Sequence, residues 1–128
     1  MFLDDTLPTS DTVTVELTYK GKPMENDDKT PMSIEAYLPH TKEYKAAMHE
    51  RVDASFEKER KEEYFKAAEL EQVAVDFMAK TTKDWNISVS AKEQNVKFSV
   101  KKAKEVYAKY PFIMEQVRRE VEKAEDFT

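Results

Sequence analysis

The N-terminal third of this chain contains two short runs in which apolar and polar residues alternate. The first spans residues 12–19, and the second spans residues 32–38. Their apolar members are Val13, Val15, Leu17 and Tyr19, then Met32, Ile34, Ala36 and Leu38. A period of two is typical of a half-buried strand, and Gly21 with Pro23 marks a turn between the runs. We predict an N-terminal antiparallel β-hairpin over residues 12–38, because sequential strands most simply pair this way.

A two-stranded hairpin is marginal by itself, so its apolar face needs helices or another sheet to cover it. In the simplest interpretation the hairpin closes the core of this chain. The alternative is an open sheet edge that accepts a strand from a partner.

Helical periodicity replaces the alternation over residues 41–80, where no glycine or proline interrupts the chain. Thr41 is a suitable N-cap. A narrow apolar stripe follows at steps of four, formed by Tyr44, Met48, Val52 and Phe56. The charged run at 57–63 is typical of a solvated helix surface. One helix over 41–80 and two helices with a break near 57–63 are both compatible with this pattern, and two antiparallel helices would bury more apolar surface.

The most apolar helical stretch is residues 64–80. At 100° per residue, its apolar side chains cover an arc of about 220°. So wide an arc predicts a central helix with contacts on more than one side. Part of the arc would serve a partner or a helical dimer equally well, so self-association stays open.

The last third of the chain contains the only tryptophan, Trp85. Ile87 and Val89, then Val96 and Phe98, flank a polar turn, which predicts a short hairpin over 84–98 or a loop with one strand. Ser99 is a good N-cap residue, and Pro111 both ends one helix and suits the first position of the next. We therefore predict a helix–corner–helix unit over 99–124.

Together these elements predict an α+β fold: an N-terminal antiparallel hairpin, a mainly helical body of three to four helices, and a small second hairpin. The length of 128 residues fits one domain spanning 1–128. Residues 1–11 and 125–128 carry no periodic pattern, and we expect them to be flexible.

Composition excludes several classes of protein. The net charge of −5 argues against nucleic-acid binding. The chain has no cysteine, so disulfides, thiol nucleophiles and thiolate zinc sites are excluded. A single glycine disfavours a phosphate-binding loop. No apolar run approaches the roughly 20 residues of a membrane-spanning helix, and the N-terminus lacks signal-peptide features. We expect no membrane partner.

The catalytic signal is absent. The two histidines, His40 and His49, lack the spacing of a metal motif and are most simply surface residues. The 26 acidic residues follow helix-surface spacing among lysines, and not an apolar pocket that would shift a pKa. We expect no enzymatic activity, no cofactor and no metal.

An aromatic cluster is the best candidate for partner binding. It comprises Tyr107, Tyr110, Phe112 and Met114, with Trp85 as a further member. Aromatic side chains grouped at a helix corner, with basic residues nearby, are typical of an interaction hot spot. In the alternative interpretation, which is favoured, these rings pack on the central helix and Trp85 is a core anchor.

Several short motifs in this region resemble small tailed-bacteriophage proteins described as tail assembly chaperones or tail assembly proteins. The motifs are Asp84-Trp85-Asn86, Phe98-Ser99, Tyr110-Pro111-Phe112-Ile113 and Glu115-Gln116-Val117. The similarity covers the C-terminal third best, and the N-terminal half agrees only in its layout of two strands followed by the helix start at Lys42–Lys45. None of these motifs carries catalysis.

The resemblance implies a non-enzymatic factor in the cytoplasm of the infected bacterium. Such a chaperone holds the tape-measure protein soluble, brings tail-tube protein to it, and is absent from the finished particle. Two rival hypotheses remain. The chain would be a structural virion component, such as a head–tail connector or minor tail protein, or a small acidic inhibitor of a host protein.

Overall fold

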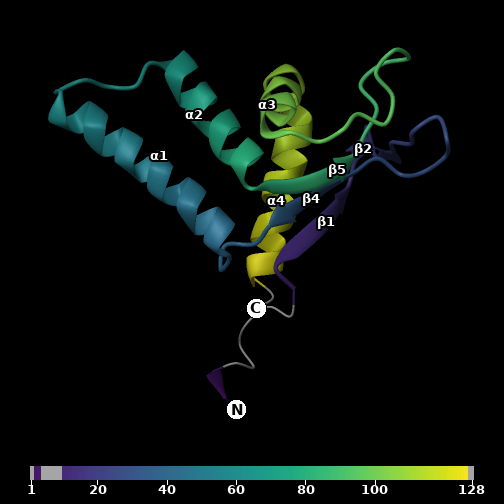
Figure 1. The fold of residues 1–128 in the computed structure, drawn as a ribbon, viewed down its shortest axis with the longest axis horizontal. Helices are drawn as coiled ribbons and strands as arrows, with labels where there is room; N and C mark the ends of the chain where they lie inside the picture. Colours follow the sequence, from purple (N-terminus) through teal and green to yellow (C-terminus); the bar gives the residue numbers. More distant parts are fainter. Residues whose placement is uncertain (1, 4–9, 127–128) are drawn as a thin grey trace.

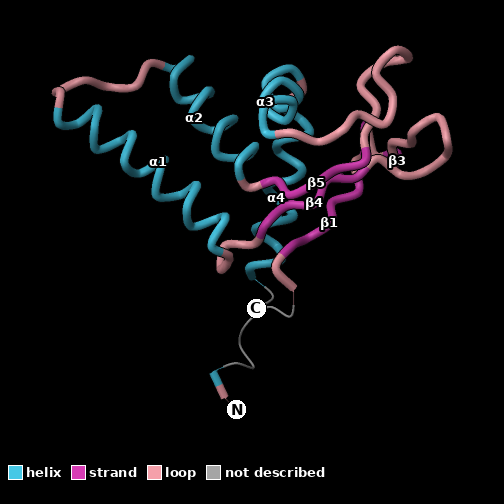
Figure 2. The backbone as a smooth tube through the Cα atoms, in the orientation of Figure 1, coloured by secondary structure: helices cyan, strands magenta, loops and turns pink. Residues whose placement is uncertain are grey.

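The computed structural model describes residues 2–3 and 10–126 and shows an α+β fold (Figures 1 and 2). Four helices accompany a small antiparallel sheet within this part of the chain. The elements are β1 (Thr12–Glu16), β2 (Thr18–Tyr19), β3 (Lys22–Pro23), β4 (Ser33–Tyr37), α1 (Lys42–Arg60), α2 (Ala67–Lys80), β5 (Thr82–Asn86), α3 (Val100–Lys109) and α4 (Pro111–Asp126).

The main sheet has three strands in the order β1–β4–β5, and all neighbours are antiparallel. The predicted hairpin is confirmed: β1 pairs with β4, and Val15 lies opposite Ile34. The third strand, β5, enters after α2 and places Trp85 opposite Ile34 from the other side. The sequence does not predict this pairing, because only one residue of β5, Trp85, is strongly apolar.

Two loops complete the sheet end of the molecule. A two-stranded hairpin that was not predicted lies between β1 and β4, where β2 pairs with β3 around Gly21 at φ +79°. In the predicted hairpin region 84–98, one strand is followed by a loop, which is the alternative left open above. The loop is held by the Val96 N–H, which donates to the Ile87 carbonyl at 2.9 Å, and by a bridge between Ser90 and Glu93.

The region 41–80 is two helices. Thr41 caps α1, as predicted, with its hydroxyl accepting from the Tyr44 N–H at 3.2 Å. The helix ends at Arg60, and residues 61–66 connect it to α2. Together α1 and α2 form a helical arm that projects away from the sheet (Figure 1). An ion pair joins the two helices near the tip of the arm, with Lys58 Nζ at 2.8 Å from Glu69 Oε2.

The predicted central position of residues 64–80 is wrong for their N-terminal half. Only the C-terminal half of α2 enters the core, through Val75, Phe77, Met78 and Ala79. Leu70 is 55% exposed, and Tyr64 lies outside the helix and is 92% exposed. The physical reason is that the arm extends beyond the sheet, so the sheet does not cover the residues towards its tip.

The corner between α3 and α4 forms as predicted. Ser99 caps α3 by accepting from the Lys102 N–H at 3.0 Å, and α4 begins at Pro111 directly after Tyr110. The core lies between the inner face of the sheet, α3, α4 and the end of α2. Its members from the last two helices are Ala103, Val106, Tyr107, Ile113, Val117 and Val121.

The expected flexible ends fall mainly on residues outside those that the structure describes. Two described parts differ from the expectation. Asp11 is held next to the start of β1, because its carbonyl accepts from the Leu38 N–H at 2.8 Å. At the other end, α4 continues to Asp126, two residues into the expected tail.

Candidate functional site

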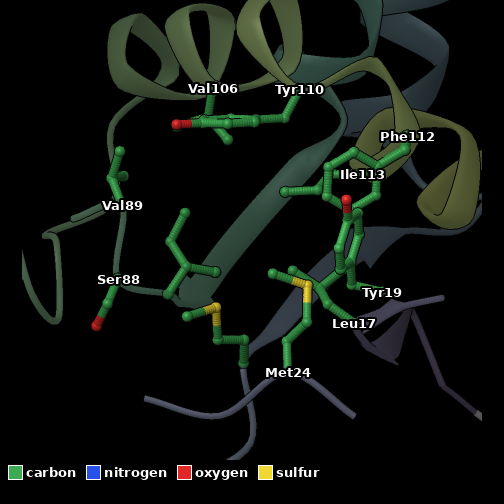
Figure 3. Close-up of a pocket in the computed structure, with 11 residues that line it drawn as sticks. Leu17, Tyr19, Met24, Ser88, Val89, Val106, Tyr110, Phe112 and Ile113 are labelled. Carbon is green, nitrogen blue, oxygen red and sulfur yellow. The ribbon is translucent and has the colours of Figure 1, made fainter. Parts of the chain in front are cut away.

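An apolar groove of about 380 Å³ lies between the α3–α4 corner and the loops at one end of the sheet (Figure 3). We call it the aromatic groove. Its lining residues are Leu17, Tyr19, Met24, Met32, Ile87, Ser88, Val89, Val106, Tyr110, Phe112 and Ile113. A volume of this size lies within the range of pockets that accept a small molecule or several side chains.

Three rings form the aromatic wall of the groove. Tyr110 and Phe112 flank Pro111 at the helix corner, and their ring centroids are 6.4 Å apart in an edge-on arrangement. Tyr19 comes from β2, and its ring centroid lies 5.5 Å from that of Phe112. Such tilted contacts are favourable for aromatic pairs, so the wall is preformed. Phe112 is 36% exposed and Tyr19 is 53% exposed, so both can still contact another molecule.

The opposite wall is aliphatic and contains two methionines. Met24 and Met32 are held by backbone bonds, since the Met24 N–H donates to the Leu17 carbonyl and the Met32 N–H donates to the Met24 carbonyl. Unbranched thioether side chains fill irregular gaps and adapt to different partners. Ile87 and Val89, from the segment after β5, complete this wall. The groove therefore combines a fixed aromatic side with an adaptable one.

Ser88 is the only lining residue without an apolar or aromatic side chain. Its hydroxyl donates to Asn26 Oδ1 at 2.6 Å and accepts from the Asn95 N–H at 2.9 Å. Figure 3 shows this oxygen directed away from the cavity. The groove thus offers mainly apolar contact and few hydrogen bonds.

Comparisons with models of protein families, with curated proteins and with solved structures find no match to this chain. Its geometry and residues carry the functional argument.

The five predicted partner-binding residues separate into three places. Tyr110 and Phe112 line the aromatic groove. Met114 is half-buried and lines a different groove, described below. Tyr107 and Trp85 are core residues, with 0% and 9% of their surface exposed, so neither presents a binding surface in this conformation. For these two, the alternative interpretation as packing residues holds.

The contacts of the two buried rings explain their position. The Tyr107 hydroxyl lies 2.7 Å from the Thr82 hydroxyl, which in turn donates to the Met78 carbonyl at 2.8 Å. Burial raises the pKa of Tyr107 to about 12, while the bond to Thr82 lowers it. Trp85 donates through Nε1 to the Val96 carbonyl at 2.9 Å and meets Phe98 edge-on, with ring centroids 5.1 Å apart. Both rings anchor the structure.

A second groove, of about 350 Å³, lies between α1, α2 and α4. Its apolar floor includes Phe77, Met78 and Met114, and charged residues line it as well. Among these, Arg118 bonds both Glu115 and Glu122. The bond to Glu115 is the main reason that the pKa of Arg118 is raised, and Arg118 lowers the pKa of Glu115 in turn. These charges already satisfy one another, so this groove is the weaker candidate.

No group of three or more metal-ligating side chains occurs within residues 2–3 and 10–126. His40, for example, has a single acidic neighbour, with Nε2 at 3.0 Å from Asp11 Oδ1. No helix in the described part of the chain has both the length and the apolar character to cross a membrane.

The sequence predicts the helix-corner wall of the aromatic groove but not the wall that the strands and their loops form. Tyr19 and Met32 belong to the predicted strands and Met24 lies between them, and the sequence does not mark any of the three for partner binding. The sequence has no local signal that separates Tyr19 from the other apolar positions of the first alternating run, because the five-residue length of β1 and the exposure of Tyr19 depend on strand pairing.

Proposed function

We propose that this chain is a non-enzymatic tail assembly chaperone of a tailed bacteriophage. It binds an apolar segment of the tape-measure protein, the tail-tube protein or both in the aromatic groove during tail assembly. The infected bacterium's cytoplasm is where such a factor acts.

The observation that carries this proposal is a coincidence between motif and groove. The segment Tyr110-Pro111-Phe112-Ile113 is part of the resemblance to the tail assembly proteins, and three of its four residues line the groove. Pro111 fixes the corner that sets Tyr110 and Phe112 side by side. Packing of the core alone does not require two partly exposed rings on one wall of a cavity.

The chemistry of the groove also supports binding to an apolar protein segment. Chaperones of this kind need an exposed apolar surface that tolerates more than one sequence. The two methionines supply adaptable contacts, and the rings supply rigid contact area at low entropic cost. The few hydrogen-bonding groups favour recognition by shape and apolar character.

Co-expression with the candidate tape-measure and tail-tube proteins of the same genome tests the proposal. We expect tape-measure protein to become soluble with this chain and to co-purify with it. The double variant Tyr110→Ala and Phe112→Ala should weaken the complex while circular dichroism shows the fold intact. Phe56→Ala is the matched control, because Phe56 is an equally large ring that is 62% exposed on α1, outside the groove.

Three outcomes would contradict the proposal. If neither protein binds and the chain occurs in purified virions at fixed stoichiometry, it is a structural component. If a host protein co-purifies specifically in its place, the chain acts as an inhibitor. If Phe56→Ala weakens the tape-measure complex as much as the double variant does, the groove is not the binding site.

A further inference from the structure

The outer edge of β1 carries backbone groups that no other strand in the described part of the chain uses. In the β1–β4 register, the bonds from the Leu17 N–H to the Met32 carbonyl and from the Leu38 N–H to the Asp11 carbonyl fix which residues face β4. Alternate residues of an antiparallel strand direct both backbone groups to the same side. Thr14 and Glu16 therefore direct their N–H and C=O groups outward, on the side where no strand of the described residues pairs with β1.

The ends of this edge are closed by side chains. At one end, the Gln116 amide donates to the Thr18 carbonyl at 2.7 Å and accepts from the Thr18 N–H at 2.9 Å, as a neighbouring strand would. At the other end, the Ser10 hydroxyl donates to the Thr12 carbonyl at 3.0 Å and accepts from the Thr12 N–H at 3.3 Å. Within the described residues, only Thr14 and Glu16 of β1 retain unpaired outward backbone groups.

We call the unpaired edge formed by Thr14 and Glu16 the open window, and it is symmetric about Val15, which lies between them. In an antiparallel pair of identical strands centred on Val15, Thr14 of each copy lies opposite Glu16 of the other. Each of these two pairs exchanges both of its N–H···O bonds, so all four groups of each copy are satisfied. The same register keeps the two Glu16 carboxylates from lying directly opposite each other, which would be unfavourable.

The surface beside the window is also self-complementary. A hollow of about 220 Å³ separates the β1 edge from α4, and it is lined by Val15, Glu16, Thr18, Gln116, Arg119, Glu120 and Lys123. Its charged side chains are two acidic and two basic. Lys123 pairs with Glu120 at 3.1 Å, whereas Arg119 has no ion-pair partner within the part of the chain that the structure describes. The equal number of acidic and basic side chains leaves this surface without a net charge that would repel its copy, and the register places the second Val15 directly opposite the first.

We propose that β1 pairs with β1 of a second copy of this chain about a two-fold axis at Val15, which joins two three-stranded sheets into one continuous sheet. This dimer uses a different surface from the aromatic groove and does not depend on the proposed chaperone function.

The mass of the chain in solution, measured by sedimentation equilibrium over a wide concentration range, tests the pairing. We expect a monomer–dimer equilibrium. Thr14→Pro removes the outward N–H of Thr14 and leaves every hydrogen bond to β4 intact. An edge strand tolerates proline at such a position. Symmetry removes two intermolecular bonds, so the dissociation constant should rise about 30-fold. Thr14→Ala is the matched control, because it keeps the backbone donor and should dimerise like the wild type.

Cross-linking tests the register, since the chain has no cysteine and each introduced thiol is unique. A mixture of the Thr14→Cys and Glu16→Cys chains should form a disulfide-linked heterodimer on mild oxidation, because paired residues lie within disulfide range. Neither chain alone should cross-link efficiently.

Four results would overturn the proposal. The first is that the chain is monomeric at every concentration. The second and third are that a folded Thr14→Pro variant dimerises like the wild type, or that Thr14→Ala loses the dimer. The fourth is that Thr14→Cys chains cross-link to one another as readily as to Glu16→Cys chains. Circular dichroism and thermal unfolding verify that each variant is folded.

Discussion

Replacing Tyr107 with phenylalanine deletes one hydroxyl from the centre of the core. The ring is fully buried, and its hydroxyl bonds the Thr82 hydroxyl at 2.7 Å. Thr82 keeps its own bond to the Met78 carbonyl, so the substitution leaves no buried donor unpaired. We therefore expect the variant to lose only the net value of one hydrogen bond, about 1 kcal/mol, at neutral pH.

The same substitution should have the opposite effect at high pH. The pKa of Tyr107 is about 12 in the folded state and about 10 in the unfolded chain, because burial disfavours the charged phenolate. Between these values the unfolded chain loses the proton and the folded chain keeps it, so stability falls as pH rises. The wild type should lose about 1.4 kcal/mol by about pH 11, whereas the phenylalanine variant has no such group to ionise. The variant should thus match or exceed the wild type there.

Urea unfolding monitored by Trp85 fluorescence, at about pH 8 and about pH 11, measures this crossover. Ionisation of the lysines and of the other tyrosines is common to both proteins and cancels in the difference. A difference between wild type and variant that is the same at both pH values would show that Tyr107 ionises as freely in the folded protein as in the unfolded chain. The account of its burial would then be wrong.

Two further predictions concern the fold. Ser99→Ala removes the side-chain acceptor for the Lys102 N–H and should lower the free energy of unfolding by about 1 kcal/mol, measured by urea titration; an unchanged midpoint would contradict the capping role. Phe77→Ala should cost about 3–5 kcal/mol, because Phe77 is 8% exposed and packs edge-on against Tyr44. Phe56→Ala, at an exposed site on α1, should stay within about 0.5 kcal/mol in the same assay, and equal losses in both variants would refute the placement of these rings.

Local signals predicted the parts of the fold that local chemistry decides. Alternation located the two strands of the hairpin, and Thr41 and Ser99 cap the helices that they were expected to cap. The Tyr110–Pro111 corner follows from the backbone restrictions of proline, which act between adjacent residues. Each of these predictions depended on a few neighbouring positions.

The features that sequence analysis missed depend on residues far apart in the chain. β5 joins the sheet beside β4, and nothing within Thr82–Asn86 specifies that partner. The arc of α2 identified apolar residues correctly, but apolar character does not reveal how far a helix extends beyond the core. For the same reason, the aromatic cluster could not be divided into buried Tyr107 and exposed Phe112 before the packing of α3 and α4 was known.

The bond between Gln116 and Thr18 has a consequence for the order in which the chain can fold as it is synthesised. It joins positions 98 residues apart, and the same helix supplies Val117 and Val121 to the core under the first strand. While α4 is still missing, the strands made earliest have their apolar side chains uncovered, and native contacts of such long range form slowly. Folding of this domain is thus completed only after α4 has left the ribosome. A product that terminates before Pro111 would keep that apolar face bare and would aggregate.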